Sequence, residues 1–195
     1  MNPNFSGIRY VLLEAILIVF GVLIALGLNE WRQNRNQAER AQIALKSIRD
    51  EIQSNRDRVT ASLEYHRSRI DTLAALRGGS DDRTPSPRLF PKGFIYPAPV
   101  LDIAWKSAQT ANVVDRLPYP TVLTIARIYA EQEHYNEQAR RSGEIIYHEL
   151  YYSGATAIAA NSTRLLSILH TFRFSERRLL AVYNEALAEL NGSGN

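Results

Sequence analysis

The stretch YVLLEAILIVFGVLIALGL runs from Tyr10 to Leu28 and contains a single ionisable side chain, Glu14. At about 1.5 Å per residue, a helix of this length spans the hydrocarbon core of a bilayer. Arg9 precedes the stretch and residues 29–32 (NEWR) follow it. Charged and aromatic residues of this kind are typical of the headgroup region. The sequence therefore predicts one N-terminal transmembrane helix, with the lipid bilayer as its first partner.

Two other interpretations of this stretch are open. Ala25-Leu26-Gly27 loosely fits the cleavage site of a signal peptide. The apolar run, however, exceeds the roughly 7–15 residues of a usual signal-peptide core. A buried core helix is the other alternative, but so many apolar residues on every face are too many for a domain of this size. Length therefore favours an uncleaved anchor.

Three residues of the anchor are candidates for a contact with another helix. Glu14 lies about one turn inside the membrane, where it either meets a partner helix or a proton path, or is a tolerated interfacial carboxylate near Arg9. Gly21 and Ala25 form a small-xxx-small pair that permits close helix packing. A homo-oligomer or a membrane-protein partner is the corresponding expectation.

Orientation is predicted from the positive charges that flank the anchor. Arg9 and the terminal amine lie on the N-terminal side. More positive charges lie close to the anchor on the C-terminal side, which favours a cytoplasmic body. These charges are carried by Arg32, Arg35, Arg40 and Lys46.

A stretch without proline or glycine runs from Asn29 to Arg77 and predicts a stalk helix continuous with the anchor. Its apolar residues recur at steps of three and four, in a coiled-coil-like pattern that Asn55 and His66 interrupt. A seam of this length packs equally well on the body of the same chain or on a second copy. The stripe consists of Ala38, Ala41, Leu45, Ile48, Ile52, Val59, Leu63, Ile70 and Leu73.

The remainder predicts an all-α fold, a helical bundle on a membrane stalk. Five prolines within residues 80–100 exclude a helix there and favour an ordered surface loop. We expect a short helix over Leu101–Asp115 and a long one from Thr121 with Gly143 as a candidate break. A further helical run should follow Gly154, and a last helix should be capped by Ser175. The predicted divisions are a tail 1–9, the anchor 10–28, the stalk 29–77, the loop 78–100, the bundle 101–191 and a flexible end 192–195.

Composition and motifs point away from several functions. The net charge of +3 comes from 23 basic and 20 acidic residues that largely alternate, which does not suggest a nucleic-acid partner. The chain has no cysteine, and no P-loop, G-x-S-x-G or G-x-G-x-x-G occurs. Glu131 and His134 form one E-x-x-H, whereas di-iron bundles need two such motifs. We therefore expect no enzyme activity, no metal and no cofactor.

Aromatic residues of the bundle suggest an alternative function. Trp105 and Tyr129, together with Tyr147 and Tyr151 near the end of the long helix, are candidates for the lining of a ligand pocket. A ligand-sensing helical bundle of the cell envelope is the corresponding hypothesis. Aromatic packing in the core accounts equally well for the same residues.

The N-terminal run resembles a family of bacterial single-pass membrane proteins known only as a domain of unknown function. Members open with a pattern like YLL-x-E-I…G-I-L-I-A-L-x-x-N-x-W, and Asp102, Ala104 and Trp105 resemble a later segment. The resemblance implies a bacterial inner-membrane location and a shared interface pattern that includes Glu14, Gly21, Asn29 and Trp31. It supplies no reaction, cofactor or catalytic residue. The matching residues are Tyr10, Leu12, Leu13, Glu14, Ile16, Ile18, Val19, Gly21, Leu23, Ile24, Ala25, Leu26, Asn29 and Trp31.

Overall fold

The computed structural model describes residues 4–78, 87–153 and 162–192, and all regular structure in these ranges is helical. The predicted all-α fold is thereby confirmed. Residues 79–86 of the predicted loop and 193–195 of the predicted flexible end lie outside the described residues. The elements are α1 (Asn4–Gly78), α2 (Ile103–Thr110), α3 (Tyr119–Ser153) and α5 (Ser162–Gly192), with short 3-10 turns at Pro87–Leu89 and Val114–Arg116.

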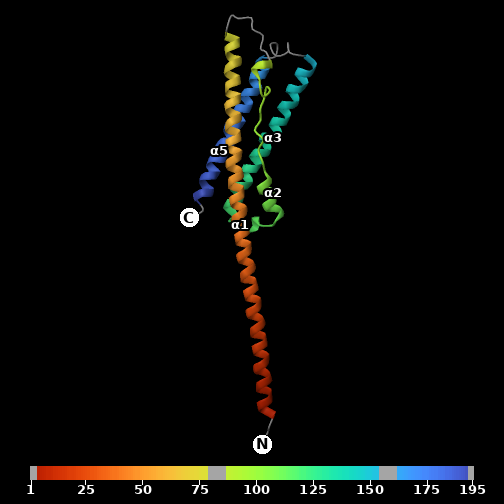
Figure 1. Ribbon diagram of the computed structural model, residues 1–195, viewed down its shortest axis with the longest axis vertical. Helices are drawn as coiled ribbons and strands as arrows, with labels where there is room; N and C mark the ends of the chain where they lie inside the picture. Colours follow the sequence, from red (N-terminus) through yellow and green to blue (C-terminus); the bar gives the residue numbers. More distant parts are fainter. Residues whose placement is uncertain (1–3, 79–86, 154–161, 193–195) are drawn as a thin grey trace.

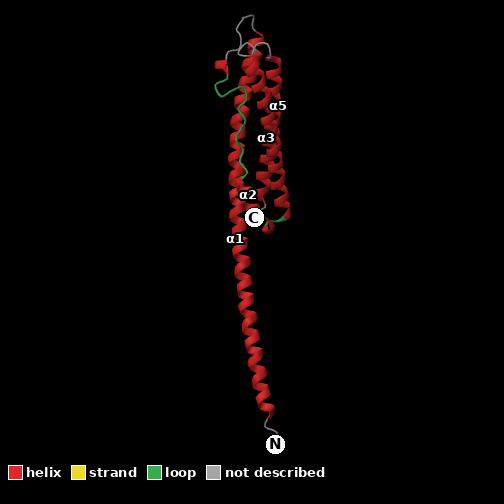
Figure 2. Ribbon diagram, turned by 90° about the vertical axis from the view of Figure 1, so that its right-hand side faces the viewer, coloured by secondary structure: helices red, strands yellow, loops and turns green. Residues whose placement is uncertain are grey.

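The chain runs up and down along one long axis (Figure 1). Helix α1 rises from the N-terminus, the segment 87–102 descends beside it, α3 rises and α5 descends. Helix α5 packs against both α1 and α3. The descending segment, called the strap below, takes the position of a fourth helix and is the green trace along α1 in Figure 2. The C-terminus therefore lies at the end of the body from which the lower part of α1 emerges.

Helix α1 has two parts that differ in burial. Every residue from 11 to 40 is exposed, whereas burial begins at Ala41 and recurs at steps of three and four as far as Leu73. The stripe from Ala41 onward therefore packs on the body of its own chain. Within the described residues, α1 is the one helix long and apolar enough to cross a membrane, and no other element covers its apolar window.

The main core lies where α1, α3 and α5 meet. Ile48 and Ile52 of α1, Ile125 of α3, and Phe172 and Tyr183 of α5 are all fully buried in it. A smaller cluster at the far end joins Ile70, Leu73, Phe90, Ile146, Leu165 and Leu169. Along α5, Leu179, Tyr183, Leu187 and Leu190 are buried in the main core, while Leu180 is partly buried against it.

Three details of the predicted helices are wrong. Helix α3 continues through Gly143, because one glycine in a helix costs only about 1 kcal/mol. Ser175 lies inside α5 rather than at its start, since its hydroxyl binds Gln138 of α3 instead of capping a helix. The helix expected over Leu101–Asp115 is shorter, Ile103–Thr110, because Asn55 holds the backbone of Leu101 and Asn112 adopts a left-handed φ of 51°.

Candidate functional site

The strap has no neighbouring strand, so side chains have to satisfy its backbone polar groups. One stripe of α1, with members three or four residues apart, bonds to strap residues in antiparallel order. Asn55 and Ser62 lie on this stripe between apolar neighbours. The bonds to the strap join Asn55 to Leu101 N and O, Arg58 to Pro99 O, Ser62 to Tyr96 O, His66 to Tyr96 N, Tyr65 to Gly93 O and Arg69 to Leu89 O. Glu51 continues the series at Ala104 N, in the first turn of α2.

Asn55 is the most heavily bonded residue of this stripe. Its Nδ2 donates to Leu101 O at 2.7 Å and to Gln132 Oε1 at 3.0 Å, and its Oδ1 accepts from Leu101 N at 2.9 Å. Gln132 also donates to Leu101 O and accepts from Tyr183. One amide pair therefore links α1, the strap, α3 and α5.

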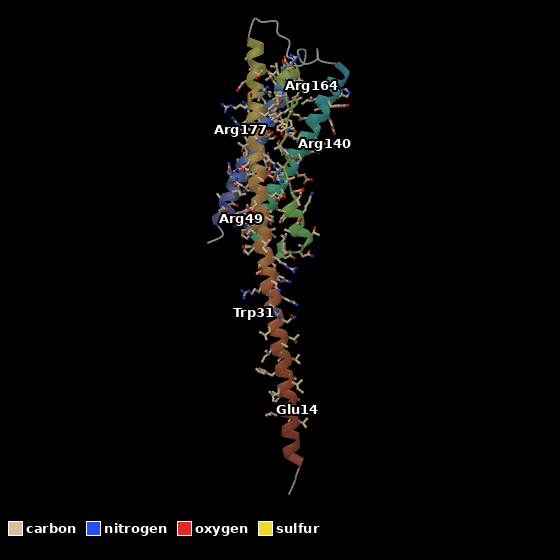
Figure 3. All side chains as sticks on the ribbon, in the orientation of Figure 1. Glu14, Trp31, Arg49, Arg140, Arg164 and Arg177 are labelled. Carbon is tan, nitrogen blue, oxygen red and sulfur yellow. The ribbon has the colours of Figure 1, made fainter. Side chains whose placement is uncertain are left out.

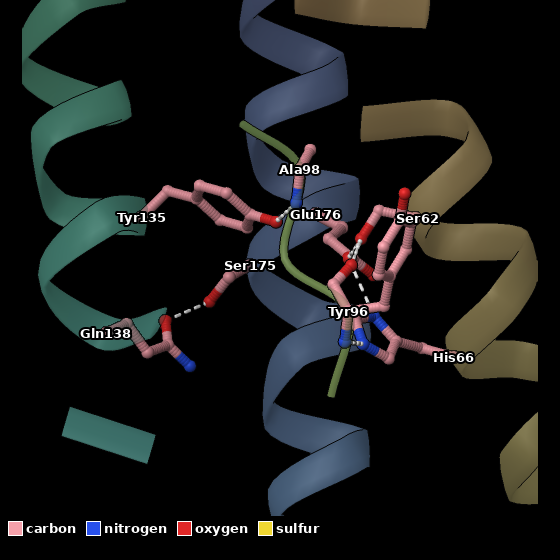
Figure 4. Close-up of polar contacts among 8 residues, drawn as sticks. All are labelled: Ser62, His66, Tyr96, Ala98, Tyr135, Gln138, Ser175 and Glu176. Carbon is pink, nitrogen blue, oxygen red and sulfur yellow. Dashed lines mark hydrogen bonds and ion pairs between the residues drawn. The ribbon is translucent and has the colours of Figure 1, made fainter. Parts of the chain in front are cut away.

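His66, Ser62 and Glu176 form a second buried cluster, and all three are fully buried (Figure 4). His66 Nε2 accepts from Tyr96 N at 2.8 Å, which leaves the ring proton on Nδ1, 2.8 Å from Glu176 Oε1. Ser62 Oγ lies 2.5 Å from Glu176 Oε1 and 2.6 Å from Tyr96 O. One serine proton cannot serve both contacts at the same time. The hydroxyl of Ser62 is therefore shared between the carboxyl group of Glu176 and the carbonyl of Tyr96.

The cluster contains the residue types of a nucleophilic triad but lacks its geometry. In such a triad the serine bonds to a histidine nitrogen that acts as a base. Here His66 Nε2 is occupied by the Tyr96 backbone, and Ser62 bonds to the carboxyl and the strap. Since the three side chains are fully buried, the arrangement holds the strap on α1 and α5.

Of the predicted pocket residues, the structure brings Trp105 and Tyr129 together. Their rings are stacked, with centroids 5.8 Å apart and planes 8° from parallel. The Tyr129 hydroxyl donates to Glu51 at 2.6 Å, and the same carboxylate accepts from Ala104 N near the start of α2. The two rings therefore pack against each other between α1, α2 and α3.

The other two predicted pocket residues lie further along α3. Tyr147 is 18 residues beyond Tyr129, about 27 Å along the helix, and its side chain is 70% exposed. The side chain of Tyr151 lies outside the described residues. The structure does not bring Tyr147 to the Trp105–Tyr129 pair.

Burial changes the acidity of three tyrosines. It raises the pKa of Tyr135 to about 12, and it raises the pKa values of Tyr129 and Tyr183 further above the ordinary value. A hydrogen bond to Glu51 adds to the effect at Tyr129. Because these pKa values are raised, the protonated phenols stabilise the fold below about pH 10, and this stabilisation is lost as the pH rises toward 12.

We expect an alkaline titration to show the late ionisation of a buried tyrosine. Tyr135 should ionise only near pH 12, together with loss of helix, whereas a free phenol ionises near pH 10. Phenolate absorbance and circular dichroism measured on one sample check this. A Tyr135→Phe variant identifies its step. Ionisation of every tyrosine near pH 10 in an intact helical protein would contradict the prediction.

A cleft of about 380 Å³ lies between α3 and α5. Glu131 pairs with Arg178 across it at 2.6 Å, and Phe174 stands at its edge with 70% of its surface exposed. The two residues of the predicted E-x-x-H therefore have different surroundings. Glu131 bonds to an arginine, and His134 is an exposed lining residue of the cleft. Among the described residues, no group of three or more His, Asp or Glu side chains is placed to hold a metal ion.

The candidate contact residues of the N-terminal helix lie far below the body, as the labels of Glu14 and Trp31 show in Figure 3. At 3.6 residues per turn, Gly21 and Ala25 point within about 20° of Glu14. Asn29 lies about 60° from that direction and Trp31 about 100° from it. No atom lies within 4 Å of a Cβ built on Gly21. Three of the five predicted residues therefore share one open face.

Sequence reasoning missed most of the polar residues that hold the strap. Glu51, Ser62, Gln132 and Glu176 were not singled out, although each lies on a stripe of buried apolar residues. A polar residue inside an apolar stripe is the available signal, and the sequence analysis uses it only for Asn55 and His66.

Comparison with models of protein families, with curated proteins and with solved structures finds no match to this chain.

Proposed function

We propose that the chain is a single-pass protein of a bacterial inner membrane whose helical body is a non-enzymatic interaction module. The observation that carries this proposal is the exposure of α1 from residue 11 to residue 40 beneath a body that begins at Ala41. The apolar part of this exposed helix, residues 11–28, is unfavourable in water and suits a bilayer. Residues 29–40 would then hold the body about 18 Å from the membrane.

The partner contact that we propose is the face of α1 that carries Glu14, Gly21 and Ala25. Arg32 points in the direction of Glu14, since 18 residues make about five turns. Ala41, the first buried residue, is two and a half turns beyond Arg32 and points to the opposite side. The body therefore lies on the side of α1 away from this face. The transmembrane helix of a second copy of this chain, or of another membrane protein, has room to approach there.

The anchoring is tested by extraction. The full chain should stay with the membranes through high-salt and alkaline washes and be released by detergent. Release without detergent would refute the anchor. A compartment-sensitive reporter fused to the C-terminus should report a cytoplasmic body, as expected from the positive charges that follow the anchor. A periplasmic signal would reverse the orientation and leave the anchor intact.

The contact is tested by cross-linking, which the absence of natural cysteines makes clean. Single variants Gly21→Cys and Ala25→Cys should form disulfide-linked dimers in membranes treated with an oxidant. Leu23→Cys lies at nearly the same depth but about 200° from Gly21 around the helix, so it should not. Equal cross-linking at the three positions would contradict the contact. So would the absence of cross-linking at all three, if the variants Gly21→Leu and Glu14→Gln also co-purify with the same proteins as the wild type.

A further inference from the structure

The cleft between α3 and α5 is a separate feature from the anchor and from the strap. Its volume of about 380 Å³ is within the range of small-molecule sites, and its described lining residues belong to α3 and α5. Neither Tyr129 nor Tyr147 is among its described lining residues. We propose that it binds a free amino acid with a large apolar side chain. The lining residues used in the argument are Glu131, Glu137, Gln138, Arg141, Phe174 and Arg178.

One lining residue of the cleft, Gln138, has an unsatisfied donor that lies just beneath the cleft surface. Gln138 Nε2 is buried without a hydrogen-bond partner, while its Oε1 accepts from the Ser175 hydroxyl. A buried amide nitrogen without a partner costs about 1–3 kcal/mol. Once the Gln138 amide turns toward the cleft, a ligand with an acceptor oxygen would recover that energy. A carboxylate oxygen is the strongest neutral-pH acceptor for such a donor.

The rim carries both signs of charge. Arg178 pairs with Glu131 at 2.6 Å, and Arg141 pairs with Glu137 at 2.8 Å. Hydrogen bonds from Arg140 and Arg141 lower the pKa of Glu137 to about 2, so this carboxylate is ionised at physiological pH. Exposed ion pairs contribute little to stability, and a ligand can compete for their members at small cost. Two cations and two anions at one opening suit a zwitterion better than a singly charged ligand.

Part of the lining is apolar. Leu179 and Tyr135 form the buried part of the lining, and the ring of Phe174 stands exposed beside them. An apolar ligand group that covers this exposed ring would remove apolar surface from water, which is favourable. A ligand with an ammonium and a carboxylate on one carbon and an apolar side chain beyond it matches these three parts of the cleft. A peptide end carries only one of the two charges.

The test is calorimetric titration of the full chain in lipid nanodiscs with L-phenylalanine. We expect binding in the micromolar to millimolar range. Phenethylamine and 3-phenylpropionate, which each keep one charge, should bind about tenfold more weakly, and N-acetylphenylalanine amide should bind weakest. The proposal would be overturned if N-acetylphenylalanine amide bound as tightly as L-phenylalanine. It would also be overturned if L-phenylalanine gave no heat of binding at millimolar concentration.

Variants locate the site. Phe174→Ala and Gln138→Leu should each weaken L-phenylalanine binding by about tenfold or more. Leu123→Ala, which changes an exposed apolar residue of α3 outside the cleft, should leave binding unchanged. Because Phe174 is exposed, its removal does not threaten folding, and circular dichroism verifies this. Unchanged affinity in both cleft variants would place any binding elsewhere. Neither result depends on whether α1 is an anchor.

Discussion

Replacing Phe172 by alanine is expected to lower the free energy of unfolding by about 3–5 kcal/mol. The side chain is fully buried on α5, and its ring centroid lies 5.2 Å from that of His66 and 6.4 Å from that of Tyr135. Truncation removes apolar surface burial and leaves a cavity between α1, α3 and α5. The rings around it are fixed by hydrogen bonds to the strap, so the cavity cannot collapse easily.

Phe174→Ala is the matched control, since it makes the same change two residues further along the same helix. Its side chain is 70% exposed, so stability should change by less than about 0.5 kcal/mol. Urea unfolding of the full chain in detergent, followed by circular dichroism, measures both values. Similar losses for the two variants would mean that α5 is packed with a different face inward. A loss below about 1 kcal/mol at Phe172 would mean that the site relaxes around the cavity.

The helices could be predicted because their signal is local. Apolar residues three or four apart mark the buried stripe of α1 from Ala41 to Leu73, and Gly78 ends the helix where the sequence predicts. The five prolines likewise exclude a helix from the strap. Nothing local, however, indicates that this segment returns along α1. Its position is determined by bonds such as those from Asn55 and Ser62, across 46 and 34 positions of sequence.

Ser175 illustrates why local rules failed at one helix end. Serine before a charged, apolar-patterned stretch is a good N-cap, because its oxygen can accept from a free backbone N–H. In the structure α5 begins thirteen residues earlier, at Ser162, and the Ser175 hydroxyl donates a hydrogen bond to Gln138 of α3. A tertiary contact thus replaced the cap. Glu176 was overlooked for a related reason, since its partner His66 lies 110 positions away.

The polar interior was visible in the sequence only as an irregularity. Asn55 and His66 were recognised as interruptions of an apolar seam, but an interruption does not identify the partner. Both prove to be fully buried, and both bond to strap backbone. Buried polar groups are hydrogen-bonded in folded proteins, so an interruption of this kind implies a partner segment without backbone pairing of its own. The prolines of the strap supply such a segment.

The second large effect is expected from Asn55→Leu, a change that keeps side-chain volume and removes the hydrogen bonds. Leu101 N–H loses the partner that Asn55 Oδ1 provides, while Leu101 O keeps Gln132 Nε2. We expect a loss of about 2–4 kcal/mol, mostly from the orphaned N–H. Urea unfolding measures it, and the exposed Asn136→Ala on α3 is the surface control. Hydrogen exchange at the Leu101 amide should accelerate in the Leu variant alone.

Asn55→Asp distinguishes a hydrogen-bonding role from a packing role at the same position. An aspartate keeps an acceptor for Leu101 N–H but turns its second oxygen toward Leu101 O and Gln132 Oε1, which are themselves acceptors. The charged form should therefore be at least as destabilising as leucine. Protonation restores a donor, so acidification should recover stability relative to wild type in the Asp variant and not in the Leu variant. If both variants respond alike to pH, shape rather than hydrogen bonding holds the strap at this point.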